Sequence, residues 1–197
     1  MQANNKNDPS YGEASPLYEK TLGVRSCFKG HAVSVDAIDI ELPDGRRSVR
    51  EVVRHNPAVA ILARRPDGRF IFVRQYRKCV ERAFIEIPAG CMEAGEAPDV
   101  TALRELREES GYVVKRMLPL GPIFCCPGYS EELIHLFYAE VGEKAGKTDF
   151  DPDENIETLL YTKEAVEAAF LDGTIFDAKT YSAWLLWKLR GPAEYGA

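Results

Sequence analysis

Three glutamates near the middle of the chain, Glu105, Glu108 and Glu109, have the spacing i, i+3 and i+4. On a helix with 3.6 residues per turn, this spacing places them on one face within roughly 100° of arc. Three carboxylates held together repel one another and raise one another's pKa. A divalent cation relieves that repulsion, and oxygen ligands without Cys or His favour Mg²⁺ or Mn²⁺ over zinc. The trio therefore predicts a Mg²⁺ site, with Mn²⁺ as the alternative ion, whose remaining partners are substrate phosphates.

A solvated acidic helix face is the alternative interpretation, because runs of charge on helices usually face water. The trio, however, has neighbours that a plain solvated face does not need. Arg104 adjoins it, Gly90 and Gly95 lie in the preceding loop, and Gly111 follows the last glutamate. These neighbours favour a built site over a solvated surface.

The element that carries the three glutamates reads as a helix. Pro98 suits the first helical turn, Asp99 favours the positive end of the helix dipole, and Gly111 suits the position just after the last turn. Leu103 and Leu106 are expected to mark the buried side of this helix.

The remaining elements follow from hydrophobic periodicity and turn residues. An unbroken apolar run at 58–63 predicts a strand that is buried on both faces, and Pro-Asp-Gly turns at 43–45 and 66–69 connect strands. Strands are expected at 31–42, 46–54, 58–63, 70–76, 83–87, 132–141 and 155–161, and further helices at 163–171 and 177–190. This order predicts an α+β fold, with a mixed β-sheet covered by helices and a small N-terminal antiparallel β unit.

Composition bounds the class of protein. The chain has 197 residues and a net charge of −6, which excludes a general nucleic-acid-binding surface because such surfaces need clustered Lys and Arg. Residues 1–16 lack an apolar segment, so we expect no secretory signal. There is no apolar run of 18 residues or more, so we expect no membrane span. The five cysteines form neither a CxxC pair nor a zinc pattern, which predicts reduced thiols and a cytoplasmic location.

The segment 90–112 resembles the Nudix signature: Gly, five residues, Glu, seven residues, Arg-Glu, an apolar residue, any residue, Glu-Glu, any residue, Gly and an apolar residue. The matching residues are Gly90, Glu96, Arg104, Glu105, Leu106, Glu108, Glu109, Gly111 and Tyr112. This resemblance implies the Nudix α/β/α sandwich. The Asn, Ser, Pro and Gly content of the N-terminus predicts a flexible tail over 1–20. The N-terminal β unit is expected over 21–55 and the Nudix hydrolase domain over 56–197.

A looser resemblance extends over about 22–190 and is similar to the ADP-ribose pyrophosphatase branch of the family. It is carried by the segments 50–62, 73–77, 86–90, 126–137 and 151–157, and by Pro127, which lies 15 residues beyond Tyr112. Related GDP-mannose hydrolases share several of these matches.

The resemblance implies a role for each residue of the metal site. The backbone carbonyl of Ala89, together with Glu105 and Glu109, would hold the metal ions. Glu108 would contribute to a metal or to a bridging water, and it is the alternative to Glu154 as the general base.

Other roles implied by the resemblance lie around the metal site. Glu96 would brace the loop through Arg104, with Gly90 and Gly111 as structural positions of the motif. Arg77 would contact the diphosphate or the terminal ribose, and its alternative is a surface arginine at the end of a strand.

Two further implied roles concern the nucleobase and the attacking water. Arg50 and Glu51 would lie near the base, and their alternative is an exposed cross-strand charge pair. Glu154 would position or deprotonate the water, and its alternative is a merely solvated acidic loop.

The activity implied by the resemblance is Mg²⁺-dependent hydrolysis of the pyrophosphate bond of a nucleoside diphosphate sugar. ADP-ribose, cleaved to AMP and ribose 5-phosphate, is the first expectation, and GDP-mannose or a broad range of nucleotide sugars is the second. A non-catalytic Nudix-fold regulator is a distant alternative, disfavoured by the complete set of carboxylates and the lack of a basic recognition helix. The resemblance also implies a homodimer in which the N-terminal sheet of one subunit helps to build the site of the other.

Overall fold

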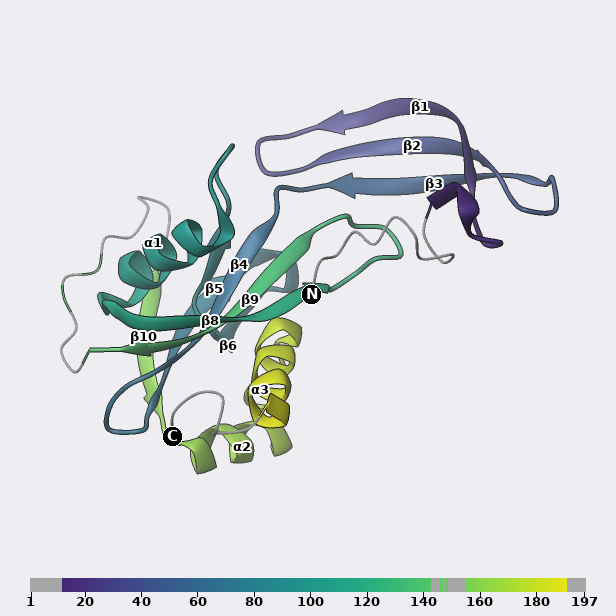
Figure 1. Ribbon diagram of the computed structural model, residues 1–197. Helices are drawn as coiled ribbons and strands as arrows, with labels where there is room; N and C mark the ends of the chain where they lie inside the picture. Colours follow the sequence, from purple (N-terminus) through teal and green to yellow (C-terminus); the bar gives the residue numbers. More distant parts are fainter. Residues whose placement is uncertain (1–11, 143–145, 147, 149–154, 191–197) are drawn as a thin grey trace. The chain divides into compact units, whose positions relative to one another are not determined.

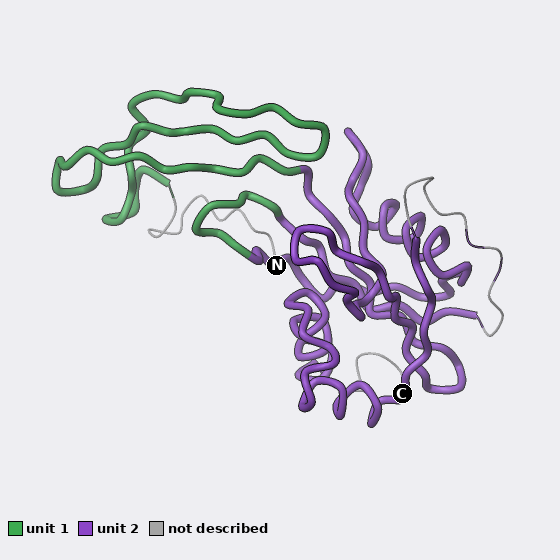
Figure 2. The backbone as a smooth tube through the Cα atoms, turned by 180° about the vertical axis from the view of Figure 1, so that it is seen from behind, with its two compact units in different colours: residues 1–55, 126–132 green, residues 56–125, 133–197 purple. Residues whose placement is uncertain are grey.

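The computed structural model describes residues 12–142, 146, 148 and 155–190. The chain forms two compact units (Figure 2). The first contains residues 1–55 together with 126–132, and the second contains residues 56–125 and 133–197. No helix in the described part of the chain is both long enough and apolar enough to cross a bilayer.

The first unit is an antiparallel sheet with the strand order β1-β2-β3 (Figure 1). Its strands are β1 (Lys20–Lys29), β2 (Ser34–Glu41) and β3 (Arg47–Arg54), preceded by a short 3₁₀ helix, η1 (Gly12–Ala14). The predicted strands at 31–42 and 46–54 correspond to β2 and β3. The strand β1 was not predicted. Gly23 and two irregularities in its pairing with β2 interrupt its pattern, and nearly all of its residues are exposed, so it lacks the signature of a buried strand.

The segment 126–132 belongs to the first unit through hydrogen bonds to the end of β3. The amide of Val53 donates to the carbonyl of Tyr129 at 2.7 Å, and the amide of Glu131 donates to the carbonyl of Val53 at 3.2 Å. The side chain of Arg54 pairs with Glu131 and with Asp36 of β2. A loop far away in the sequence therefore extends the N-terminal sheet.

The second unit is built on a mixed seven-stranded sheet with the order β10-β5-β4-β9-β8, to which β6 and β7 add by pairing with β5 and β4. The pair β4–β9 is parallel and the others are antiparallel. Its strands are β4 (Ala58–Arg64), β5 (Phe70–Arg77), β6 (Arg82–Glu86), β7 (Ala89–Cys91), β8 (Val114–Phe124), β9 (Leu133–Val141) and β10 (Ile156–Tyr161), with a 3₁₀ turn, η2 (Lys78–Val80), between β5 and β6.

Helices cover both faces of this sheet: α1 (Pro98–Ser110) on one side, and α2 (Lys163–Leu171) and α3 (Ala178–Arg190) on the other (Figure 1). The side chains of strand β4 show why both faces of the sheet need a helix. They alternate between the faces, so that Val59 and Ile61 join a core with Leu106 of α1, whereas Ala60 and Leu62 join a core with α3. The α+β prediction of a helix-covered mixed sheet with a separate N-terminal antiparallel sheet is therefore confirmed.

Other details of the prediction were also wrong. Strand β8 was missed because it contains Pro119 and Pro122, which cannot donate to a ladder; they are tolerated here because β8 is an edge strand that pairs only with β9. Leu103 was expected on the buried side of α1, but it is 45% exposed, whereas Leu106 is fully buried. The buried stripe of α1 runs through Ala102 and Leu106 instead.

Candidate active site

The helix α1 holds its glutamates at the boundary between core and solvent. It begins with Pro98 and ends at Gly111, whose left-handed φ of 72° directs its amide to the carbonyl of Arg107 at 2.8 Å. Because Leu106 is fully buried against the sheet, the rotation of the helix about its axis is fixed. Glu109 consequently lies inside, only 3% exposed, while the Glu108 side chain is 37% exposed.

Glu109 connects α1 to the turn that follows β6. Its Oε2 accepts a hydrogen bond from the amide of Ala89 at 3.2 Å, and its main-chain carbonyl accepts one from the hydroxyl of Thr158 in β10, also at 3.2 Å. A buried carboxylate is costly unless positive charge or hydrogen bonds compensate it. The donor at Ala89 supplies one such partner and places the carboxylate beside the backbone position that the sequence assigned to metal binding.

Glu105 lies directly over Gly90. A Cβ built on Gly90 would overlap the carboxylate carbon and both carboxylate oxygens of Glu105. Only glycine leaves this space, because every other residue would displace the carboxylate. The Gly90 position of the motif is therefore explained by the close approach of Glu105 to the β7 backbone.

Arg104 joins the acidic residues of the motif into one network. Its Nη1 donates to Glu105 at 2.8 Å and to Glu108 at 3.0 Å, and its Nε and Nη2 grip the two oxygens of Glu96 at 3.2 and 3.1 Å. The hydrogen bond from Arg104 lowers the pKa of Glu96 to about 2. The pKa of Arg104 is raised in turn, first by Glu96. Through its bond to the Cys91 carbonyl at 3.2 Å, Arg104 also ties the loop after β7 to the helix.

The donor set suits a hard divalent cation. Within the described residues, no three Asp, Glu, His or Cys side chains already converge closely enough to hold an ion, and Arg104 is the cation that pairs with Glu105 and Glu108. Two carboxylates nevertheless lie at the same short backbone segment, 89–90. The buried Glu109 accepts a hydrogen bond from the amide of Ala89, and Glu105 fills the space above Gly90. Carboxylates and a backbone carbonyl are the ligands that Mg²⁺ and its relatives use.

Arg77, at the end of β5, is anchored by an acidic residue that the sequence analysis did not single out. Its Nε donates to Glu86 Oε1 at 2.8 Å, and its Nη2 lies 2.7 Å from the same oxygen. Burial alone would lower the pKa of Arg77, but the hydrogen bond and charge of Glu86, together with the charges of Glu109 and Asp177, raise it. Arg77 is therefore a fixed cation whose surroundings include the α1 carboxylate Glu109.

Glu86 itself is 2% exposed and also pairs with Lys179 of α3, which in turn pairs with Asp177. The pair Glu86–Lys179 joins residues 93 positions apart in the sequence, so no local spacing could reveal it. The available signals were an acidic residue that ends a strand and a lysine in the first turn of a helix.

Arg50 and Glu51 belong to β3 of the first unit. Neighbouring residues of a strand point to opposite faces, so the two cannot pair with each other. Arg50 instead donates to Glu19 from Nε at 3.0 Å and from Nη2 at 2.5 Å, and this hydrogen bond raises the pKa of Arg50. Glu51 is exposed.

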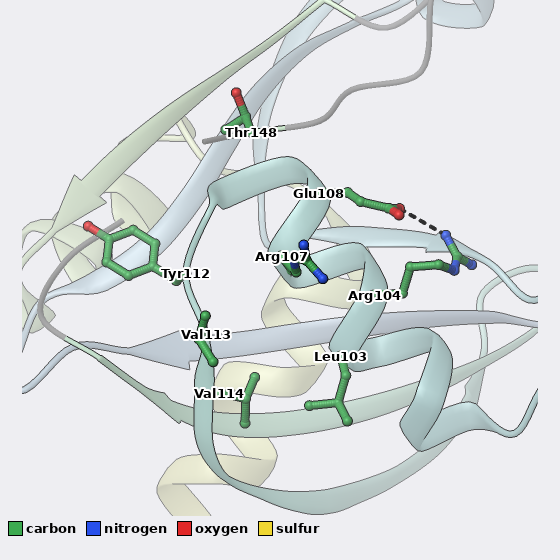
Figure 3. A pocket seen from close by; sticks show the side chains of 8 residues that line it. All are labelled: Leu103, Arg104, Arg107, Glu108, Tyr112, Val113, Val114 and Thr148. Atoms are coloured by element: carbon green, nitrogen blue, oxygen red, sulfur yellow. Dashed lines mark hydrogen bonds and ion pairs between the residues drawn. The ribbon is translucent and has the colours of Figure 1, made fainter. Parts of the chain in front are cut away.

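A cavity of about 750 Å³ lies along the exposed flank of α1 (Figure 3). Arg104 and Glu108, joined by their ion pair, are among its polar lining residues, whereas neither Glu105 nor Glu109 lines it. Its lining residues are Leu103, Arg104, Arg107, Glu108, Tyr112, Val113, Val114 and Thr148. The cavity therefore includes one carboxylate of the α1 trio, Glu108, but neither of the other two. The predicted base Glu154 lies outside the described residues.

Several known proteins are similar to this chain over most of its length. The family model described as "NUDIX domain" matches residues 54–184. An ADP-ribose pyrophosphatase of Bacillus subtilis (strain 168) is 41% identical over 165 residues, which is 83% of this chain and 89% of that protein. A methanol dehydrogenase activator of Bacillus methanolicus is 40% identical over 84% of this chain and 90% of its own length.

A more distant relative and one solved structure are also similar to this chain. A GDP-mannose pyrophosphatase of Yersinia enterocolitica is 31% identical over 79% of this chain and 85% of its own length. A crystal structure titled as an ADP compounds hydrolase superposes with a TM-score of 0.79 at 22% identity, over 90% of this chain and 96% of the other, and so supports the fold. The chain belongs to the Nudix family.

Proposed function

We propose that this protein hydrolyses the pyrophosphate bond of a nucleoside diphosphate sugar, and that its substrate is ADP-ribose. Water and ADP-ribose would give AMP and ribose 5-phosphate. The similarity to the Bacillus subtilis ADP-ribose pyrophosphatase over most of both chains supports the choice of substrate.

One observation carries the proposal of phosphate chemistry. The buried Glu109 and the inward-folded Glu105 meet the backbone at 89–90, and the fixed cation Arg77 has Glu109 among the charges that act on it. A carboxylate cluster that can gather divalent cations, close to a permanent cation, suits a substrate that carries two negative charges.

In this proposal Glu105, Glu108, Glu109 and the carbonyl of Ala89 hold Mg²⁺, with Mn²⁺ as a substitute. Divalent ions in that position would offset the diphosphate charge and lower the pKa of a bound water. The Arg77 guanidinium would bind a phosphate oxygen and orient the diphosphate for in-line attack by water.

The proton of the attacking water needs an acceptor. We propose Glu154 for this role. Glu108 is the alternative, because it is the most exposed of the three glutamates in the α1 trio and lines the cavity beside the site. A change of Glu154 to Gln that lowers kcat far more than it raises KM supports this assignment, and the reverse pattern makes Glu154 a binding residue.

We propose that the protein acts as a homodimer in the cytoplasm, with Arg50 and Glu51 near the nucleobase. The N-terminal sheet exposes large apolar side chains, including Leu22, Val24 and Phe28, on a sheet with few buried residues. Contiguous exposed apolar surface commonly marks a protein interface.

GDP-mannose is the second candidate substrate, supported by the similarity to the Yersinia enterocolitica enzyme. The deciding experiment measures kcat/KM with Mg²⁺ for ADP-ribose, GDP-mannose, UDP-glucose and a dinucleoside polyphosphate. The proposal predicts the highest value for ADP-ribose. A higher kcat/KM for GDP-mannose would make GDP-mannose the substrate instead of ADP-ribose. If none of the four compounds is hydrolysed, the proposed pyrophosphatase activity is rejected.

A further inference from the structure

A buried group of four charges lies next to the carboxylate site. We call it the Glu86 cluster; it consists of Arg77, Glu86, Asp177 and Lys179. Oε1 of Glu86 accepts from Arg77, and its Oε2 accepts from Lys179, which also lies 3.1 Å from Asp177. The side chains of Glu86, Asp177 and Lys179 are 2%, 14% and 12% exposed. With two carboxylates and two cations, the cluster is neutral.

Lys179 occupies an unfavourable place for a lysine. It is in the first turn of α3, where the helix dipole repels positive charge, and its side chain is buried. Burial lowers the pKa of Lys179, but the charges of Glu86 and Asp177 outweigh this and raise it, so the ammonium group stays charged. Such departures from local rules are expected where a residue serves a site rather than the stability of its own helix.

The cluster also holds the backbone turn that leads to the metal-site residues. Asp177 accepts from the hydroxyl of Thr180 at 2.6 Å, and the same hydroxyl oxygen accepts from the amide of Ile87 at 3.1 Å. Two residues later, the amide of Ala89 donates to Glu109. The start of α3 is thus linked by hydrogen bonds to the turn on which the α1 carboxylates converge.

The contacts between Arg77 and Glu86 use only part of the Arg77 guanidinium group. Nε donates a hydrogen bond to Glu86 and Nη2 forms an ion pair with the same oxygen. No hydrogen bond from Nη1 occurs within the described residues, and the side chain is 38% exposed. The free edge can donate to a phosphate oxygen while the other edge stays fixed.

We propose that Lys179 is a positioning residue for the diphosphate, which it never touches. By neutralising Glu86, Lys179 leaves the positive charge of Arg77 available to the ligand, while Glu86 keeps the guanidinium group oriented. Without Lys179 the cluster carries a net negative charge that opposes a dianionic ligand. This inference rests on the proposed diphosphate substrate.

The test uses the full chain with Mg²⁺ and the non-hydrolysable probe α,β-methylene-ADP, and measures Kd by calorimetry. Lys179→Met is expected to raise Kd by roughly tenfold or more, because the net negative charge of the cluster then opposes the ligand. Glu86→Gln keeps an oxygen that can accept from Arg77 and makes the cluster positive, so Kd is expected to stay equal or to fall. Lys188→Met is the matched control: it removes an exposed α3 lysine that pairs with Glu167, and Kd is expected not to change.

Lys179→Met is expected to raise Kd, whereas Glu86→Gln is not. This difference separates a positioning role from a merely structural one. If Lys179→Met and Glu86→Gln weaken binding equally, the cluster only maintains the fold and the inference is wrong. If Lys179→Met does not fold, the double variant Glu86→Gln/Lys179→Met replaces it, since removal of both partners of a buried pair is often tolerated. The double variant is expected to bind more weakly than Glu86→Gln, and equal or tighter binding overturns the inference. Wild-type protein that does not bind the probe rejects the proposed substrate class as well, whereas binding that Lys179→Met leaves unchanged rejects the inference alone.

Discussion

The two β-sheets of this protein differ in what their faces meet. In the seven-stranded sheet, β4 has six buried residues in a row because helices cover both faces. In the three-stranded sheet, β1 has no buried residue, and only Ala37 and Ile40 of its neighbour β2 are buried. One sheet is therefore a packed scaffold for charged side chains, and the other is an exposed surface that we propose binds a second copy of the chain.

The largest expected effect comes from matched changes of glutamate to glutamine in the two units. Glu109→Gln is expected to lower kcat by about 100-fold or more, because it removes one negative charge from the α1 glutamates, which are the proposed metal ligands. Glu51→Gln in the exposed sheet is expected to leave kcat unchanged and to raise KM by less than about tenfold. Steady-state kinetics with ADP-ribose at saturating Mg²⁺ measure both, and near-wild-type turnover by Glu109→Gln would refute the metal assignment.

The same change of valine to alanine compares the stability that each sheet contributes. Val59 in β4 is fully buried and Val24 in β1 is 56% exposed. Val59→Ala is expected to lower the free energy of unfolding by about 2–3 kcal/mol through lost burial and a cavity. Val24→Ala is expected to change it by about 0.5 kcal/mol or less. Urea unfolding at low protein concentration gives both values, and equal losses would mean that β1 is packed as tightly as β4.

The exposed sheet is expected to control assembly without controlling the fold of the second unit. The wild-type chain should sediment as a dimer at micromolar concentration, and Val24→Lys/Phe28→Lys should shift it to a monomer, since buried unpaired charge opposes association. The near-ultraviolet circular dichroism of the tryptophans in α3 should not change. Wild-type protein that sediments as a monomer contradicts the proposed dimer.

The smallest expected effect concerns pH and Glu96. Because Arg104 lowers the pKa of Glu96 to about 2, below its ordinary value of 4.5, the fold favours the charged carboxylate. The stabilisation is complete above the ordinary value, declines as the pH falls below it and is lost as the pH passes the folded value. The Tm difference between wild type and Glu96→Gln should therefore shrink from about pH 6 to about pH 3. A difference that does not depend on pH would mean that the ion pair with Arg104 contributes nothing measurable.

The sequence predicted the parts of the molecule whose signals are local. Pro98 and Gly111 mark the ends of α1, and the apolar run at 58–63 marks a strand covered on both faces. The parts that were missed lack such signals: β1 has no buried residue, and β8 contains two prolines that only an edge position tolerates.

The residues of the candidate site also fall into two groups: those that local sequence patterns predicted and those that they could not predict. The α1 glutamates were found because their spacing is helical, and the contact of Arg104 with Glu96 lies within one motif. The pair Glu86–Lys179 spans 93 residues, and only the folded sheet brings β6 and α3 together. Long-range charge pairs of this kind leave no periodic pattern in a sequence.

The most direct test of the account is a titration of the protein with Mn²⁺, read by electron paramagnetic resonance. The wild-type chain should bind Mn²⁺, and Mg²⁺ should displace it. Glu109→Gln should lose most of this binding, whereas Glu167→Gln, at an exposed ion pair of α2, should retain it. Equal Mn²⁺ binding by wild type and Glu109→Gln would contradict the claim that the α1 glutamates form a metal site.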